Sequence, residues 1–162
     1  MTPTIRPATP DDAAAIADIL NPLIRAGGTT ALERELDAAG VADMVFDPAR
    51  LIACHVALDD SGIVAGVQWL SHIDGFPNDH GDIATFARAE PKVPGVGRAL
   101  FAATRQAARD AGLAAIMARI RADNTGGLAY YGKMGFVDHD RFIGVPLADG
   151  TRVDRIVKRL IP

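Results

Sequence analysis

The segment from residue 83 to residue 121 constrains the fold of this chain more than any other. Ile83 to Ala89 predicts a short strand, and Gly97 to Ala111 places its apolar side chains on one face of a helix. Ala115 to Arg121 alternates as a strand does. A strand, a helix and a second strand in this order predict a crossover between two parallel strands. The fold should therefore contain a sheet that this helix covers.

The rest of the chain predicts further strands and helices separated by short turns that contain Gly and Pro. A helix should begin after Thr9, with Pro10 at its first position, and end at Gly27. Asn124 can cap a helix that Gly135 ends. The other expected elements are strands at residues 4–8, 51–58, 63–70, 136–143 and 153–160, and one or two helical pieces in residues 32–46. The order β-α-α-β-β-β-α-β-α-β-β indicates one α/β domain over residues 1–162.

The composition agrees with one globular domain and excludes disorder for the chain as a whole. It has 162 residues, of which 49% are hydrophobic and 23% are charged. The N-terminus has no apolar stretch typical of a signal peptide, and no stretch is long enough to span a membrane. We therefore expect a cytoplasmic protein without a membrane partner. A single cysteine, Cys54, excludes an intramolecular disulfide and favours a buried structural thiol.

The distribution of charge indicates where an anion could bind. The whole chain has a net charge of −3, which argues against a nucleic-acid partner. Residues 88–121 nevertheless hold seven basic residues against two acidic ones. A local anionic ligand and a solvated helix face both explain this basic segment. The four histidines are too scattered to predict a metal site.

A glycine turn lies between the strand and the helix of the crossover, at residues 92–98. Glycine lets backbone amides approach an anion closely, and a helix start adds unpaired N–H groups. Lys92 and Arg98 add positive charge. A dinucleotide fingerprint would need a third small residue where Leu100 stands, and no Gly-Lys-Ser/Thr follows. The turn alone leaves two interpretations open, phosphate binding and a tight structural turn.

Three motifs together resemble the GCN5-related N-acetyltransferase (GNAT) superfamily. Lys92-Val93-Pro94-Gly95-Val96-Gly97 resembles its Arg/Gln-x-x-Gly-x-Gly/Ala motif, with Lys at the first position and Pro94 removing one backbone donor. Residues 124–136, ending Tyr131-Gly132-Lys133-Met134-Gly135-Phe136, resemble its Asn-led helix, and Ile5-Arg6-Pro7-Ala8 resembles its first strand. Asn21, Gly28-Thr29-Thr30, Asp74-Gly75-Phe76 and Asp82 resemble the phosphinothricin acetyltransferase-like branch, which usually has Glu where Asp82 stands.

The resemblance implies a fold and a partner. The fold is α/β (α+β), a mixed twisted sheet of six to seven strands flanked by about four helices, with a splay between the fourth and fifth strands. The implied cofactor is acetyl-CoA, and a homodimer is expected. The residues implied to bind the cofactor are Thr85, Phe86, Ala87, Lys92, Val93, Pro94, Gly95, Val96, Gly97, Arg98, Asn124 and Lys133. A backbone N–H near Ala87 would hold the oxyanion.

The resemblance also implies direct attack of a primary amine on the thioester. Tyr131 is implied to protonate the departing thiolate, whereas Tyr130 points about 100° away around the helix. Asp82, or a water that it holds, is the first candidate for the general base, with His80 close by and His72 as another candidate. Asp82 could equally be a solvated loop carboxylate, and Lys133 a solvated lysine.

Four functions remain open from the sequence. The first is an N-acetyltransferase for small-molecule amines, with amino acids and their analogues as candidate acceptors. The alternatives are a non-catalytic acyl-CoA-binding module, a protein or peptide N-acetyltransferase, and, last, a nucleotide-binding protein without acyl chemistry. A connection over the site at residues 144–150 would close it to a peptide.

Overall fold

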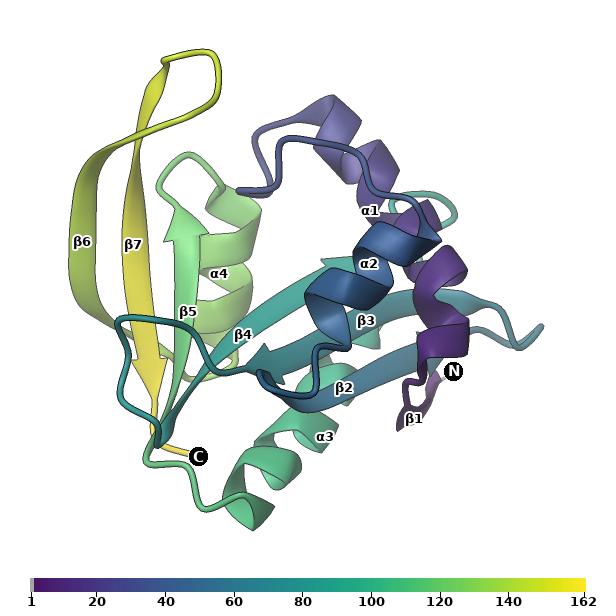
Figure 1. The fold of residues 1–162 in the computed structure, drawn as a ribbon. Coiled ribbons are helices and arrows are strands. Elements are labelled where there is room, and N and C mark those ends of the chain that lie inside the picture. Colours follow the sequence, from purple (N-terminus) through teal and green to yellow (C-terminus); the bar gives the residue numbers. More distant parts are fainter. Residues whose placement is uncertain (1) are drawn as a thin grey trace.

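A seven-stranded mixed sheet runs through the protein (Figure 1), as seen in a computed structural model that describes residues 2–162. The strands are β1 (Thr4–Pro7), β2 (Leu51–Leu58), β3 (Val64–Ser71), β4 (His80–Ala87), β5 (Ala115–Arg121), β6 (Val137–Pro146) and β7 (Arg152–Leu160). Their spatial order is β1-β2-β3-β4-β5-β7-β6. Only β4 and β5 pair in parallel among the strands of the described residues.

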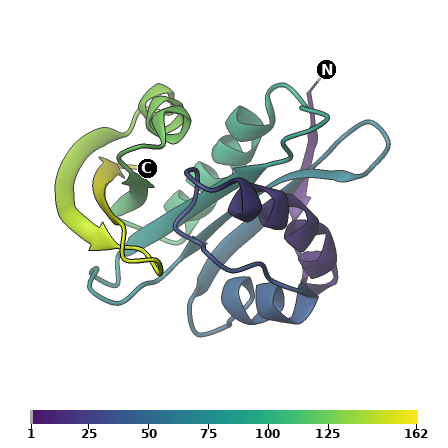
Figure 2. The same ribbon diagram turned by 90° about the horizontal axis from the view of Figure 1, so that it is seen from above.

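Four helices cover the two faces of the sheet (Figure 2). They are α1 (Ala13–Ala26), α2 (Ala38–Val45), α3 (Val96–Asp110) and α4 (Thr125–Lys133), and a 3-10 turn at Pro10–Asp12 precedes α1. Helices α1 and α2 share one buried cluster with Val56, Val67 and Trp69. A second cluster joins α3 and α4 to Phe136 and to strands β4, β5 and β7. The two helix pairs therefore bury opposite faces of one sheet.

The predicted order of elements and the parallel crossover β4-α3-β5 are confirmed. The helical piece expected within residues 32–46 is present at Ala38–Val45. The residues before it are irregular, because the Asn21 side chain bonds both the N–H and the C=O of Leu36, at 2.9 and 2.8 Å. The predicted start of β4 at Ile83 was wrong: the strand begins at His80, because residues 80–82 pair with β5, and Asp82 pairs with β3 as well.

The sheet opens between β4 and β5, as the predicted splay requires. The two strands pair only from His80/Ala115 to Asp82/Met117. Beyond this point β4 continues along β3 while β5 follows β7, so that the two halves of the sheet diverge (Figure 1). The later part of β4, up to Ala87, therefore has a sheet edge that faces an opening.

Candidate active site

The glycine turn and the end of β4 together line an open cavity of about 510 Å³. Helix α3 begins directly after Gly95, whose φ of +82° is the left-handed conformation that favours glycine. No side chain caps the first turn of α3, so its N–H groups, which have no acceptor inside the helix, are available to an anion. The lining residues are Leu23, Ala87, Arg88, Ala89, Lys92, Val93, Pro94, Gly95, Val96 and Gly97. The cavity thus brings together most of the predicted cofactor-binding residues.

The peptide groups of β4 alternate between β3 and the opening. Arg88 N donates to Ala65 O at 2.8 Å, which makes Arg88/Ala65 and Phe86/Val67 the hydrogen-bonded pairs of the β3–β4 ladder. The N–H and C=O of Thr85 and Ala87 must then face the opening. The structure therefore leaves Thr85 and Ala87 free to pair with an added extended chain. The expectation that the backbone of Phe86 also does so is wrong, because β3 uses those groups.

The Tyr131 side chain is buried in the second cluster, and its hydroxyl lies 2.8 Å from Thr85 Oγ1. Its ring packs edge-on against Phe136, with ring centres 5.2 Å apart. Burial raises the pKa of Tyr131 above its usual value, so that the phenol keeps its proton at neutral pH. A protonated phenol beside Thr85 can donate a proton to a group that reaches it.

Asp82 lies at the point where the strands part, on the face of the sheet that α1 and α2 cover. Its two carboxylate oxygens accept from Nε and Nη2 of Arg119, each at 3.1 Å. Burial raises the pKa of Asp82, and Arg119 opposes that shift without cancelling it. The ion pair therefore holds a carboxylate whose affinity for a proton is higher than that of an ordinary aspartate.

The family model for the acetyltransferase (GNAT) family matches residues 14–136 of the chain. The chain belongs to this family. The enzyme class predicted from the sequence, an N-acetyltransferase, is thereby confirmed. No curated protein matches the chain in sequence.

Solved structures share the whole fold of this acetyltransferase. A ribosomal-protein-alanine N-acetyltransferase from Brucella melitensis has a TM-score of 0.87 at 21% identity, with 98% of this chain and 99% of that chain covered. A phosphinothricin acetyltransferase from Sinorhizobium meliloti, in complex with acetyl-CoA, has a TM-score of 0.84 at 21% identity, with 99% and 89% covered. A GCN5-related N-acetyltransferase from Kribbella flavida has a TM-score of 0.84 at 22% identity, with 99% and 98% covered. The GNAT fold is thus confirmed, and acetyl-CoA as the cofactor agrees with these findings.

The other predicted site residues of the acetyltransferase lie outside the lining of the cavity. His80 Nδ1 lies 2.8 Å from Asp79 Oδ1, so that this ring is directed toward its neighbour. Asn124 caps α4 through Gly127 N at 2.9 Å and also donates to Thr29 O, so both ends of its amide have protein partners. Lys133 is exposed in the last turn of α4. His72 is half-buried, and its Nδ1 has no hydrogen-bond partner among the described residues.

Cys54 is buried, and burial raises the pKa of its thiol to about 12, in agreement with the structural role expected for it.

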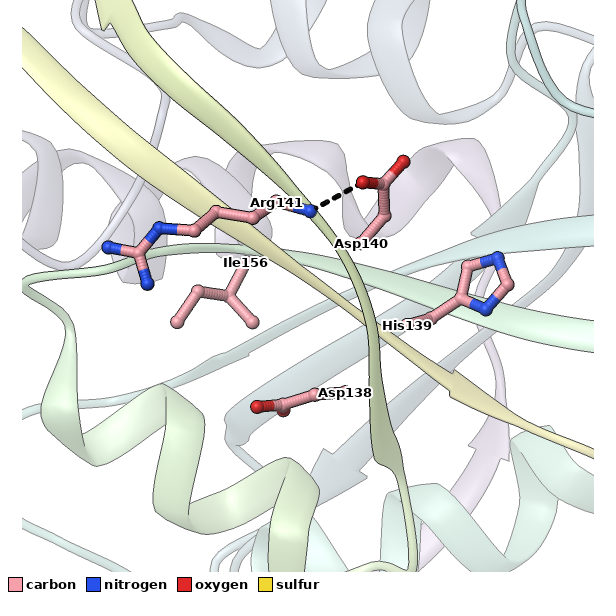
Figure 3. A pocket seen from close by; sticks show the side chains of 5 residues that line it. All are labelled: Asp138, His139, Asp140, Arg141 and Ile156. Atoms are coloured by element: carbon pink, nitrogen blue, oxygen red, sulfur yellow. Dashed lines mark hydrogen bonds between the residues drawn. The ribbon is translucent and has the colours of Figure 1, made fainter.

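A second hollow of about 310 Å³ lies on β6 and β7, away from the opening (Figure 3). Figure 3 shows that the Arg141 and His139 side chains point in opposite directions, and Arg141 N donates to Asp140 Oδ1 at 2.7 Å. None of the predicted site residues lines this hollow. No group of metal-binding side chains occurs in the described part of the chain, and no helix there is long and apolar enough to cross a membrane.

Two side chains make contacts that the sequence analysis did not predict. Tyr130 donates to Gly97 O at 2.7 Å, and a Cβ on Gly97 would lie 2.7 Å from the Tyr130 ring. Gln68 is fully buried in β3 and contacts both Tyr130 and Thr85. The single signal for Gln68 in the sequence is one amide side chain inside an apolar strand.

Proposed function

We propose that this protein transfers the acetyl group of acetyl-CoA to the primary amine of a small molecule by direct attack within a ternary complex. The observation that carries the proposal is the position of the Tyr131 hydroxyl against Thr85, on the strand whose free edge leads to the glycine turn. This arrangement places a proton donor beside a strand whose end lines the cavity at the glycine turn, where an anion can bind. A module that only binds acyl-CoA has no need of the proton donor.

The residues around the cavity fit coenzyme A. The cofactor, when bound, supplies an acyl thioester. The first N–H groups of α3, at Val96, Gly97 and Arg98, would hold its diphosphate, and the charges of Lys92 and Arg98 would support them. The edge of β4 at Thr85 and Ala87 would bind its extended arm, and the Ala87 N–H would be available to hold the oxyanion.

The proton balance assigns two roles. The amine nitrogen would form a bond to the acyl carbon as the C–S bond breaks, and the sulfur would take the proton of Tyr131, which solvent would later replace. The amine must lose a proton, and Asp82, directly or through a water, accepts it. Burial raises the pKa of Asp82, which makes it a better base than an exposed aspartate.

An amine that also carries an acid group is the acceptor that the charges favour. Arg121 of β5 stands directly opposite Arg155 of β7, and Arg119 lies two residues before Arg121 on the same face. Arg119 and Arg121 pair with Asp82 and Asp123, whereas Arg155 takes part in none of the ion pairs of residues 2–162. Like charges directly opposite each other repel, and an anionic group would relieve this repulsion.

The loops over the face of the sheet that holds these arginines favour a small acceptor over a protein acceptor. Ala148 N, in the β6–β7 connection, donates to Glu33 Oε1, in the α1–α2 connection, at 2.8 Å. This bond joins two loops that would have to stay apart to admit a peptide chain.

We also propose that two copies of the protein associate as a homodimer. Strand β6 is the edge of the sheet and exposes Val137, Phe142 and Ile143. Apolar side chains gathered on one edge support association of two copies. Light scattering at several concentrations would measure the mass, and a constant monomer mass would contradict the dimer.

Release of free thiol from acetyl-CoA tests the function. The panel should contain phosphinothricin, α-amino acids, their decarboxylated amines, a polyamine and an N-terminal alanine peptide. We expect release with amines that carry an acid group and little with the matched decarboxylated amines. Preference for the peptide would favour the protein acetyltransferase. Saturable binding of coenzyme A with no release from any amine would favour the binding module.

A further inference from the structure

Gln68 lies at the centre of a buried polar chain that connects the glycine turn to Tyr131. Its Nε2 donates to Thr85 Oγ1 at 2.8 Å and to Tyr130 OH at 3.1 Å. Tyr130 OH in turn lies 2.7 Å from Gly97 O, and Thr85 Oγ1 lies 2.8 Å from Tyr131 OH. The chain joins residues of β3, β4, α3 and α4, all on one face of the sheet.

The positions of the hydrogens on Tyr130 and Gln68 follow from the chemistry of the groups. Gly97 O can only accept, so the single hydroxyl hydrogen of Tyr130 is donated to it. The Tyr130 oxygen must then accept from Gln68, which fixes the amide with its NH₂ toward Tyr130 and Thr85. The carbonyl oxygen of the amide is left buried without a partner among residues 2–162.

The bond between Thr85 and Tyr131 can run in either direction. Thr85 Oγ1 accepts from Gln68 and lies 2.8 Å from Tyr131 OH, and either of these two hydroxyls can be the donor. When Thr85 donates to Tyr131, the hydrogen of Tyr131 is left for a group that enters the site.

We propose that Gln68 is a positioning residue that, by donating to Thr85, orients the Thr85 hydroxyl to donate to Tyr131, so that the proton of Tyr131 stays free for the departing sulfur. The inference rests on the proposed role of Tyr131 as proton donor. Gln68 itself touches neither substrate nor cofactor. A buried amide with one unpartnered end lowers stability relative to an apolar side chain of similar size. A position that served only packing would therefore be filled better by methionine.

Variants of Gln68 and Thr85 test the inference by kinetics, using the amine with the fastest thiol release in the panel above. We expect Q68M and T85V each to lower kcat about tenfold, with the KM for acetyl-CoA changed less than about twofold. T85S keeps the hydroxyl and should restore most of kcat. The Tm of Q68M should equal or exceed that of the parent. A fall of Tm with unchanged kcat would overturn the inference.

A double-mutant cycle separates this inference from the proposed function. If Gln68 acts through Tyr131, Q68M should cause no further loss of kcat in the Y131F protein. Losses that multiply would overturn the role of Gln68 and leave the role of Tyr131 intact. An unchanged kcat in Y131F would instead remove the proton donor, and with it the inference.

NMR of the protein alone, without acceptor amine or acetyl-CoA, gives a further test. Tyr130 and Tyr131 are the only two tyrosines of the chain, so ¹³Cζ-tyrosine labelling gives two NMR signals, which Y130F and Y131F assign. We expect Q68M and T85V to shift the Tyr131 signal in the same direction. A Q68M protein in which only the Tyr130 signal moves would overturn the inference.

Discussion

The two faces of the opening between β4 and β5 differ in how they hold their polar groups. On the face covered by α3 and α4, Thr85 and Tyr131 lie in a buried chain of neutral hydrogen bonds. On the face covered by α1 and α2, Asp82 and Arg119 form an ion pair, and further arginines follow along β5 and β7. The difference supports the proposed division of roles. The neutral face donates a proton to the departing sulfur, whereas the charged face binds the amine and accepts its proton.

The largest expected effect that tests this division is on the charged face. Asp82→Asn should lower kcat/KM about 100-fold, because the base is lost. In the parent, kcat/KM should fall as the pH drops through the raised pKa of Asp82. Arg119→Gln removes the group that lowers this pKa, so the acidic limb should move to higher pH.

The pH profile of kcat/KM for the three proteins measures this effect. Arg109→Gln, an exposed arginine at the end of α3, serves as a charge-matched control. An acidic limb that stays in place when Arg119 is replaced would contradict the role of Asp82.

A smaller effect is expected at the glycine turn. Gly97→Ala would place a Cβ 2.7 Å from the Tyr130 ring, so the turn or the ring must move. We expect the Kd for coenzyme A to rise about tenfold, which corresponds to about 1.4 kcal/mol. Calorimetric titration measures it.

Gly132→Ala is the matched control, because a Cβ there meets no atom within 4 Å. Since Gly132 lies inside α4, this change should raise stability by about 0.5–1 kcal/mol. Equal affinities of the two variants for coenzyme A would show that the contact with Tyr130 is unimportant.

The smallest effect concerns the choice of acceptor. Arg155→Met should raise the KM for an acid-bearing amine about fivefold and leave the decarboxylated amine unaffected, since a partly exposed charge contributes about 1 kcal/mol. Steady-state kinetics with the two amines measure the ratio. A parallel change for both amines would show that Arg155 does not recognise the acid group.

Local patterns predicted most of the fold but not the irregular segment before α2. Residues 32–37 have helical spacing in sequence, yet the Asn21 side chain, 15 residues away, bonds the backbone of Leu36. The first residues of β4, His80 to Asp82, become a strand because they pair with β5. Both features depend on contacts that are distant in the chain.

The candidate site shows the same limit. The glycine turn and Tyr131 belong to contiguous motifs, and the sequence therefore indicated them. Gln68 meets Tyr130 across 62 residues of chain, so nothing near it in sequence reveals the contact. The alternation of β4 peptide groups, which separates Phe86 from Thr85 and Ala87, also depends on the register with β3.

The most direct test of the account is the Tyr131→Phe variant, measured for turnover and for binding of coenzyme A in the same preparation. We expect a kcat lower by about 100-fold and a Kd for coenzyme A changed less than about twofold. A kcat within about twofold of the parent enzyme would contradict the assignment of Tyr131 as the proton donor.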